Sequence, residues 1–390
     1  MKPISAVQGV LAASMVLCTA TPAQAANPYL NPAGVKDGLE LREGARGLMA
    51  GARAESVVAT ADGSGIQLAP GAVRGTLTLR SFATKFPFNE AIPTWNGRAG
   101  GGSGFRVTMR IPASPAGVQS PWFPAGYWGA GVDDTATTRV IQFPGGKYDE
   151  DHLVLERAVP SAELTVELAR AAPADPSPVV RLVALSYTDS TGGAGGGLGG
   201  FMPAARASSV TLRTTESIPL PYRMQLAATK KLTNSICSPA SVSAALGRFG
   251  TQVTPTDIAN IAYDKPSDIY GMWNRSVQAG AQMGLRGYIT RFRDWNAVRK
   301  VIRQGGVICP SIRFRGGEVD DPLRRHGRRM DGTKGHIVAI KGLAPRGTVI
   351  IQDPASKDWG PDSVWTQDDF AKAWFDKGGV GYVFTGPAGR

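Results

Sequence analysis

The stretch NSICSPASVSAALGRFG, residues 234–250, places a cysteine at the start of a predicted helix. Cys237 precedes a run of small and apolar residues, and Gly250 ends that run. The free N–H groups and the partial positive charge of a helix N-terminus lower the pKa of a thiol and favour the thiolate. Cys237 is therefore a candidate nucleophile. A disulfide half-cystine and a small buried residue are the two alternatives.

A thiolate nucleophile needs a general base, and the base needs a group that orients it. His336 opens a predicted strand in GHIVAIKG, and Asp353 ends the next one in IIQDPAS. If these strands are antiparallel neighbours, both residues lie at the same edge of a sheet. Gln225, upstream of the helix, could donate a hydrogen bond to a developing oxyanion. His326, in a loop rich in arginine and glycine, is the competing base.

The order Gln, Cys, His, Asp carries a resemblance to a known family. With CSPAS opening a helix, GHIVAIKG on a strand and DPAS after the next strand, the sequence resembles the papain-like cysteine peptidases of family thirty-nine. The best-known members of that family cut bacteriocin leaders after a double glycine. The resemblance covers roughly residues 218–385 and includes the trailing WTQDDFAKAW. The region upstream is similar to a β-sandwich that precedes this domain in exported homologues.

The resemblance implies a role for each candidate residue. Cys237 would be the nucleophile and His336 the general base and acid. Asp353 would orient His336, and Gln225 would form the oxyanion hole with the backbone N–H of Cys237. The glycine that typically follows the cysteine in the family is Ser238 here. The implied reaction is amide hydrolysis through a thioester, which needs no metal and no organic cofactor.

The composition describes a basic globular chain. The 390 residues carry a formal charge of +12, and 42% of them are hydrophobic, which is enough to build a core. Such a balance favours acidic partners, whether nucleic acid, anionic lipid or an anionic cell-surface polymer. Exposed helix faces explain part of this positive charge. The loop 315–334, which leads to His336, could form a lid that selects acidic substrates. Basic residues crowd into one segment: Arg286, Arg291, Arg293, Arg299, Lys300, Arg303, Arg313, Arg315, Arg324, Arg325, Arg328 and Arg329.

Residues 1–25 have the form of a secretory signal peptide. Residues 8–18 are mostly apolar, and AQA at 23–25 is a small-residue cleavage site. The apolar run is too short to span a membrane. Cys18 would leave with the signal, so Cys237 and Cys309 would remain in a secreted or periplasmic protein, either as a disulfide or as free thiols. Cys309, within VICPSI, is expected to be a core thiol.

Residues 61–188 are predicted to form a β-sandwich domain. Apolar and polar residues alternate in GTLTLRS, FRVTMRI, AELTVELA and VVRLVAL, and turn-rich segments separate these runs. Residues 27–60 lack such a pattern and are expected to be a poorly ordered lead-in. The Gly-rich segment 189–215 is typical of a flexible linker. Residues 216–390 change to helices followed by strands, so the second domain is expected to be α+β and papain-like.

Aromatic residues gather in PTWNG and PWFPAGYWG of the β domain. On a surface they would suit stacking on a sugar, although core aromatics are the commoner explanation. His152 follows acidic residues in DEDHLVLE, but a single histidine makes no recognisable metal-ligand spacing.

These observations predict an exported cysteine peptidase that acts on a peptide or protein substrate with an acidic preference. The β domain could bind a cell-surface glycan, and neither a nucleic-acid partner nor a membrane span is expected. Two alternatives stay open. One is a cell-wall peptide amidase or an acyl transferase on the same fold, and the other is a non-catalytic glycan-binding protein with a degenerate papain-like domain.

Overall fold

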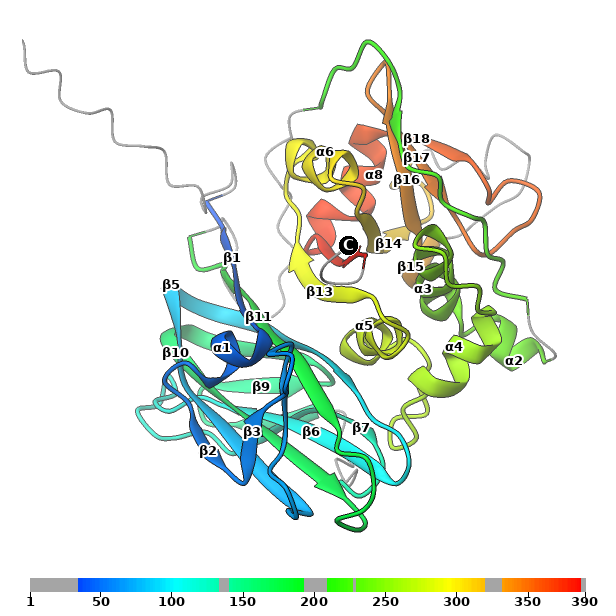
Figure 1. The fold of residues 1–390 in the computed structure, drawn as a ribbon. Helices are drawn as coiled ribbons and strands as arrows, with labels where there is room; N and C mark the ends of the chain where they lie inside the picture. The colour runs from blue at the N-terminus through cyan, green and yellow to red at the C-terminus, as the bar shows by residue number, and fades with distance from the viewer. Residues whose placement is uncertain (1–33, 133–139, 193–208, 227–228, 320–331, 387–390) are drawn as a thin grey trace, which may run out of the picture.

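The computed structural model describes residues 34–132, 140–192, 209–226, 229–319 and 332–386. The predicted signal peptide, Cys18, His326 and most of the predicted linker lie outside these ranges. The described chain forms two domains, each with a β-sheet of its own (Figure 1). The N-terminal domain is almost entirely β, whereas the C-terminal domain combines helices with strands.

The N-terminal domain is built from long antiparallel strands with a short helix near its start. Its elements are β1 (Lys36–Glu43), α1 (Gly44–Met49), β2 (Arg53–Glu55), β3 (Val57–Ala59), β4 (Ile66–Leu68), β5 (Arg74–Arg98), β6 (Ser103–Arg110), β7 (Phe123–Gly129), β8 (Val140–Phe143), β9 (Gly146–Asp149), β10 (His152–Arg170) and β11 (Val179–Asp189). The alternation predicted for β6 is confirmed, because Phe105, Val107 and Met109 are fully buried while the residues between them are partly exposed.

Within the described residues, these strands make one eleven-stranded sheet with the central order β3–β4–β11–β5–β10–β6–β7. The N-terminal end of β10 pairs with β9 and its C-terminal end with β6. The register between β10 and β5 shifts between Val154 and Val159 and again between Ala162 and Leu164. Such bulges bend strands. The predicted β domain is therefore present, but its strands form one bent sheet and not the two separately bonded sheets of a sandwich.

The sheet begins at Lys36, upstream of the predicted start at residue 61. β1 pairs antiparallel with β11 along its whole length, from Lys36 opposite Asp189 to Glu43 opposite Leu182. Sequence alternation misses β1 because Gly38 is its only fully buried residue. A Cβ on Gly38 would lie 2.3 Å from the ring of Tyr187, so the strand fits only because glycine has no side chain.

The C-terminal domain places helices before and after a second sheet. Its elements are β12 (Glu216–Ser217), α2 (Lys230–Thr233), α3 (Cys237–Arg248), α4 (Pro255–Ala262), α5 (Trp273–Gln282), β13 (Arg286–Arg291), α6 (Trp295–Arg303), β14 (Val307–Arg315), β15 (Gly332–Ile337), β16 (Ala339–Ala344), β17 (Thr348–Gln352), β18 (Ser363–Thr366), α8 (Gln367–Ala373), the 3-10 helix η1 (Phe375–Lys377) and β19 (Val380–Thr385). The central strand order of this sheet is β13–β19–β14–β16–β17–β18.

The predicted helix boundaries follow from local chemistry. The helix that begins at Cys237 ends before Gly250, whose φ of +90° suits a residue without a side chain. At α4, the Thr254 hydroxyl accepts the N–H of Asp257, and the Asp257 carboxylate accepts the N–H of Thr254. This reciprocal cap satisfies two backbone N–H groups and fixes the start of α4. None of the helices in the described ranges is long and apolar enough to cross a membrane.

The helix α5 lies between the two sheets and joins the domains (Figure 1). Gln278 accepts the N–H of Gly97 at 2.8 Å and donates to its carbonyl oxygen at 2.9 Å. Gln282 makes the same pair of bonds with Ala99, at 3.2 and 3.1 Å. Each side-chain amide therefore satisfies backbone groups of the N-terminal domain as a neighbouring strand would. These paired bonds fix α5 in register on the end of β5.

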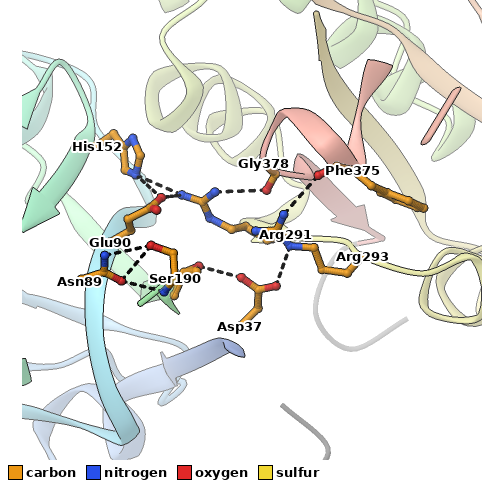
Figure 2. A network of polar contacts seen from close by, with 10 residues as sticks. Asp37, Asn89, Glu90, His152, Ser190, Arg291, Arg293, Phe375 and Gly378 are labelled. Carbon is orange, nitrogen blue, oxygen red and sulfur yellow. Dashed lines mark hydrogen bonds and ion pairs between the residues drawn. The ribbon is translucent and has the colours of Figure 1, made fainter. Parts of the chain in front are cut away.

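A second set of contacts joins the domains through β13 and the residues after it (Figure 2). Arg291 donates to the Glu90 carboxylate at 2.6 Å. The ring nitrogen Nε2 of His152 lies 3.1 Å from the same carboxylate. Arg293 donates to Asp37 at 2.9 Å. The carboxylates all belong to the N-terminal domain and both arginines to the C-terminal domain, so the network is an electrostatic junction between them.

Several arginines of the basic segment, which was expected to lie partly on exposed helix faces, pair with carboxylates of the protein itself. Arg286 pairs with Glu43 of the N-terminal domain at 2.8 Å. Arg299 pairs with Glu216 at 2.5 Å. Together with Arg291 and Arg293, these side chains neutralise carboxylates within the protein. The arginines of the predicted loop between residues 320 and 331 lie outside the described residues.

Candidate active site

Cys237 is the first helical residue of α3, directly after Ile236 in the N-cap position. The side chain of Ile236 makes no cap, so the N–H groups of the first turn are left for other acceptors. The Cys237 thiol accepts the backbone N–H groups of Ser238 and Ile337. Both donors favour a negative sulfur at this end of the helix.

His336 and Asp353 meet at one edge of the sheet, as the sequence predicted. β17 pairs antiparallel with β16, and Ala339 lies opposite Gln352, so the residues just before one strand and just after the other come together. Nε2 of His336 lies 2.8 Å from Oδ1 of Asp353. The two side chains are only 11% and 7% exposed, so the pair is shielded from water.

The Asp353 carboxylate is held by its own turn. Its Oδ1 accepts the N–H of Ala355 at 2.9 Å. The backbone N–H of Asp353 donates to the carbonyl oxygen of Gly360 at 2.8 Å. A Cβ on Gly360 would lie 2.1 Å from the carbonyl oxygen of Asp353, so the turn can close this tightly only at a glycine. The carboxylate therefore has one fixed direction, toward the imidazole.

These side chains shift one another's pKa. Burial opposes the charge of Cys237, but the hydrogen bond and the charge of His336 bring the pKa of the thiol below its ordinary value. Burial likewise opposes the charge of His336, but Asp353 and Cys237 raise the pKa of the imidazole well above its usual 6.5. Both shifts favour a thiolate beside an imidazolium.

Gln225 lies beside the turn that leads into α3. Its Nε2 donates to the carbonyl oxygen of Thr233 at 3.0 Å. Its backbone N–H donates to the carbonyl oxygen of Pro354 at 2.9 Å, next to Asp353. These two bonds place Gln225 between the turn that leads into α3 and the residue after Asp353. It is not among the residues that line the cavity described below.

Ser238, which stands where the family typically has glycine, belongs to a buried hydroxyl network. Its Oγ donates to Oγ of Ser276 on α5 at 2.8 Å and lies 3.0 Å from the hydroxyl of Tyr382 on β19. All three side chains are fully buried. The network joins α3, α5 and β19 directly behind Cys237, so the nucleophile stands on three connected elements.

A cavity of about 460 Å³ opens beside Cys237 and His336. One side of it is lined by residues 268–271 and Trp273, and the segment 268–273 is called the pocket wall below. Arg313, Lys334 and Lys377 line the cavity from β14, β15 and η1. Among the Lys, Arg, Asp and Glu side chains that line the cavity, the cations therefore outnumber the single carboxylate, Asp268 of the pocket wall.

Cys309 lies on β14 and is fully buried, as the sequence predicted. Burial alone raises the pKa of its thiol, so it is far less reactive than Cys237. Cys237 and Cys309 are both free thiols in the structure.

Most of the aromatic residues in the two motifs of the β domain are not surface groups. Trp95 is fully buried in β5. Tyr127 and Trp128 lie against Arg275 of α5, whose guanidinium carbon is 4.6 and 5.2 Å from their ring centroids. Trp122 is 40% exposed. These rings therefore serve the core and the domain junction more than an open sugar-binding face.

His152 belongs to the domain junction and not to a metal centre. In the described part of the chain, no group of three or more His, Cys, Asp or Glu side chains is placed to hold a metal ion.

Sequence reasoning did not identify the pocket wall or Lys377. Tyr270 and Trp273 reach the cavity because α5 packs against α3. No pattern in the sequence around these residues predicts that contact. Arg313 was singled out only as one basic residue among many. A charged residue that lines a cavity differs from one on a solvated helix face by its tertiary surroundings alone.

A cysteine at a helix N-terminus, facing a histidine and an acid at a sheet edge, defines the class of papain-like thiol hydrolases. Comparison with known proteins gives the family. Residues 217–382 match the Peptidase_C39 like family, and residues 30–188 match the Peptidase C39 N-terminal domain. Each of the two domains is thus similar to a family of C39 peptidase domains.

Solved structures give a weaker likeness. The peptidase domain of Streptococcus ComA, described as a bi-functional ABC transporter involved in a quorum sensing pathway, is 13% identical over 43% of this chain and 97% of that domain, with a TM-score of 0.31. A carbohydrate-binding module of the β-sandwich superfamily is 11% identical over 41% of this chain and 58% of that one, with a TM-score of 0.17. No curated protein matches the chain. These low scores carry no argument about function.

Proposed function

We propose that this protein is an exported cysteine peptidase that hydrolyses amide bonds through Cys237, His336 and Asp353. The observation that carries the proposal is the 2.8 Å contact between His336 and Asp353, beside a cysteine thiol at the N-terminus of α3. The apolar segment at residues 8–18 and the AQA site support export.

In the first half of the reaction, the Cys237 thiolate attacks the carbonyl carbon of the scissile amide. A C–S bond forms, and the negative charge moves to the carbonyl oxygen. The backbone N–H of Cys237 and the side-chain amide of Gln225 donate hydrogen bonds to that oxygen. His336 then gives its proton to the leaving nitrogen, and the C–N bond breaks to leave a thioester.

In the second half, His336 accepts a proton from a water molecule. The resulting hydroxide attacks the thioester carbonyl, the C–S bond breaks, and the acid product leaves. Asp353 holds the imidazole by its Nε2 atom throughout and stabilises the imidazolium form. The cycle returns Cys237 and His336 to their charged pair.

The substrate class follows from the cavity. Arg313 and Lys334 line it close to His336, and Lys377 adds a third cation that pairs with Glu318. Cations that line a cavity favour an anionic side chain on the substrate. The proposal is therefore a peptide or protein substrate with an acidic residue near the scissile bond.

The test is active-site labelling combined with product analysis. Full-length protein is treated with a peptidyl epoxide, and the adduct is mapped by mass spectrometry; the proposal expects it on Cys237. A peptide library with acidic, neutral and basic residues should then be cut with a preference for acidic members. A protein that takes up no epoxide under reducing conditions overturns the catalytic proposal. Cleavage confined to cell-wall peptides identifies an amidase, and transfer to an added amine identifies an acyl transferase.

A further inference from the structure

A carboxylate of the N-terminal domain caps a helix of the peptidase domain. Asp151 lies in the turn between β9 and β10, and its Oδ2 accepts the backbone N–H of Trp273 at 2.9 Å. The N–H of Asn274 donates to the same carboxyl group. Met272, in the N-cap position of α5, supplies no side-chain cap. Asp151 thus provides the acceptor that the first turn of α5 lacks in its own domain.

The capped residue is also the last residue of the pocket wall. Trp273 lines the cavity beside Cys237, so its backbone position sets one side of the candidate active site. Arg275 holds the chain just before the wall, because its Nη2 donates to the carbonyl oxygen of Tyr263 at 2.9 Å. Its Nη1 donates to the carbonyl oxygen of Tyr127 in β7 at 2.7 Å. The pocket wall is therefore tied to the N-terminal domain at Trp273, and the end of α4 upstream of the wall is tied to that domain through Arg275.

These ties are buried, so water cannot replace them. Asp151 and Arg275 are each 6% exposed, and Asn274 is 1% exposed. Loss of the Asp151 carboxyl would leave two backbone N–H groups without an acceptor at a dry helix end. Burial and the neighbouring Glu150 raise the pKa of Asp151 to about 7, against the bonds from those N–H groups. Near neutral pH the cap therefore works through hydrogen-bond acceptance more than through full charge.

The support of the nucleophile shares α5 with this cap but acts through side chains. Cys237 sits on α3, and the Ser238 hydroxyl is bonded to the hydroxyls of Ser276 on α5 and Tyr382 on β19. The Asp151 carboxyl instead binds a backbone N–H at the start of α5, so a change at Asp151 acts first on the pocket wall that ends there.

We propose that Asp151 is a positioning residue of the active site, which holds the pocket wall at the distance from Cys237 that a peptide substrate requires. The inference rests on the proposed peptidase function. It makes the N-terminal domain a part of the substrate-binding site, because one side of that site is fixed by a carboxylate from the other domain.

The experiment compares two probes on full-length protein. Iodoacetamide is small and reports the reactivity of the Cys237 thiolate, whereas a peptidyl epoxide must also fit against the pocket wall. Both second-order rates are measured by mass spectrometry of the Cys237 peptide. The variants are Asp151→Ala, Asp151→Asn, which keeps an acceptor oxygen, and Gln282→Ala, which breaks bonds at the other end of α5 in the same domain interface.

Asp151→Ala is expected to slow the epoxide about tenfold while leaving the iodoacetamide rate within about twofold. Asp151→Asn should restore the epoxide rate, and Gln282→Ala should leave both rates near those of the unmodified chain. Equal slowing of both probes in Asp151→Ala, or the same epoxide loss in Gln282→Ala, would mean a merely structural role and overturn the proposal. So would an Asp151→Asn variant as slow as Asp151→Ala.

A second measurement does not depend on any variant folding or on Cys237 reacting. Hydrogen exchange of the unmodified chain should show slow exchange at the amides of Trp273 and Asn274, because both donate to Asp151. Exchange at the rate of exposed amides overturns the proposal even if Cys237 is reactive. Slow exchange in a protein whose Cys237 takes up neither probe would instead refute the peptidase function and leave the interdomain cap in place.

Discussion

Nε2 of His336 lies 2.8 Å from Oδ1 of Asp353, in a turn that only a glycine at position 360 allows to close. Because Asp353 occupies Nε2, the other ring nitrogen, Nδ1, is left for proton exchange with Cys237. The contact thus fixes both the orientation and the tautomer of the imidazole.

Substitution of the three residues should rank their roles. Cys237→Ala and His336→Ala should each lower kcat about a thousandfold or more, because one removes the nucleophile and the other removes the base. Asp353→Asn should lose less, because its side-chain oxygen can still accept the Nε2 proton. Initial rates on a peptide that the unmodified protein cuts provide the measurement, and circular dichroism checks the fold. Full activity in His336→Ala would contradict the assignment and leave His326 as the candidate base.

The pH dependence of alkylation should reveal the ion pair. The pKa of Cys237 is lowered and that of His336 is raised, so the thiolate persists as the pH falls below the ordinary thiol pKa of 9.0. The rate of iodoacetamide alkylation, followed from pH 4 to 10, should have its midpoint below 9.0 in the unmodified protein. His336→Ala should move that midpoint upward. An unchanged midpoint in the variant would show that His336 does not stabilise the thiolate.

Gln225 can be tested as an oxyanion donor by Gln225→Ala, which removes the amide N–H groups without adding a charge near Cys237. Loss of one such donor lowers kcat by about a hundredfold or more. The rate of iodoacetamide alkylation of Cys237 should stay the same, because alkylation forms no oxyanion. Unchanged peptide hydrolysis in the variant would assign the oxyanion hole to backbone N–H groups alone.

The domain junction should govern stability. Arg291 and Glu90 are 6% and 15% exposed, and Glu90→Gln leaves the arginine charge buried without its partner. The variant should lower the free energy of unfolding by about 3 kcal/mol. The matched control is Glu55→Gln, which breaks the exposed pair with Arg53 and should cost no more than about 1 kcal/mol. Equal losses in the two variants would contradict the role of the junction.

The same pair predicts how stability depends on pH. Burial opposes the charge of Glu90, but Arg291 and His152 bring its pKa below the usual 4.5. The stability from this carboxylate is therefore fully present above pH 4.5 and is lost as the pH falls further. Thermal unfolding of the unmodified protein and of Glu90→Gln should differ most above about pH 5 and converge in acid. A difference that grows in acid would reverse the sign and reject the explanation.

The candidate catalytic residues could be found from the sequence because their signals are local. A cysteine before a run of small residues indicates a helix N-terminus, and two apolar runs separated by a short turn indicate antiparallel neighbours. His336 and Asp353 flank those runs, so strand pairing alone brings them together. Gln225 was predicted by its place in the chain order, and only the structure shows that it is not among the residues that line the cavity.

Sequence alternation found β6 and the other strands whose faces differ in burial, but it missed β1. That strand is specified by the absence of a side chain at Gly38, which admits the Tyr187 ring. A missing side chain leaves no periodic pattern. The same limit explains why the β domain was expected to begin at residue 61.

By itself, the sequence determined which types of side chain form the candidate site and which helices and strands carry them. Side-chain chemistry and hydrophobic periodicity can be read from residues that are neighbours in the chain. Only the tertiary structure decided what the arginines of β13 pair with and why Asp151 matters. Both depend on contacts between residues more than a hundred positions apart, in domains that meet at α5. A charged residue looks the same in the sequence whether it faces solvent, a substrate or a carboxylate of another domain. For the arginines of β13, the packing of the two domains places a carboxylate opposite the guanidinium.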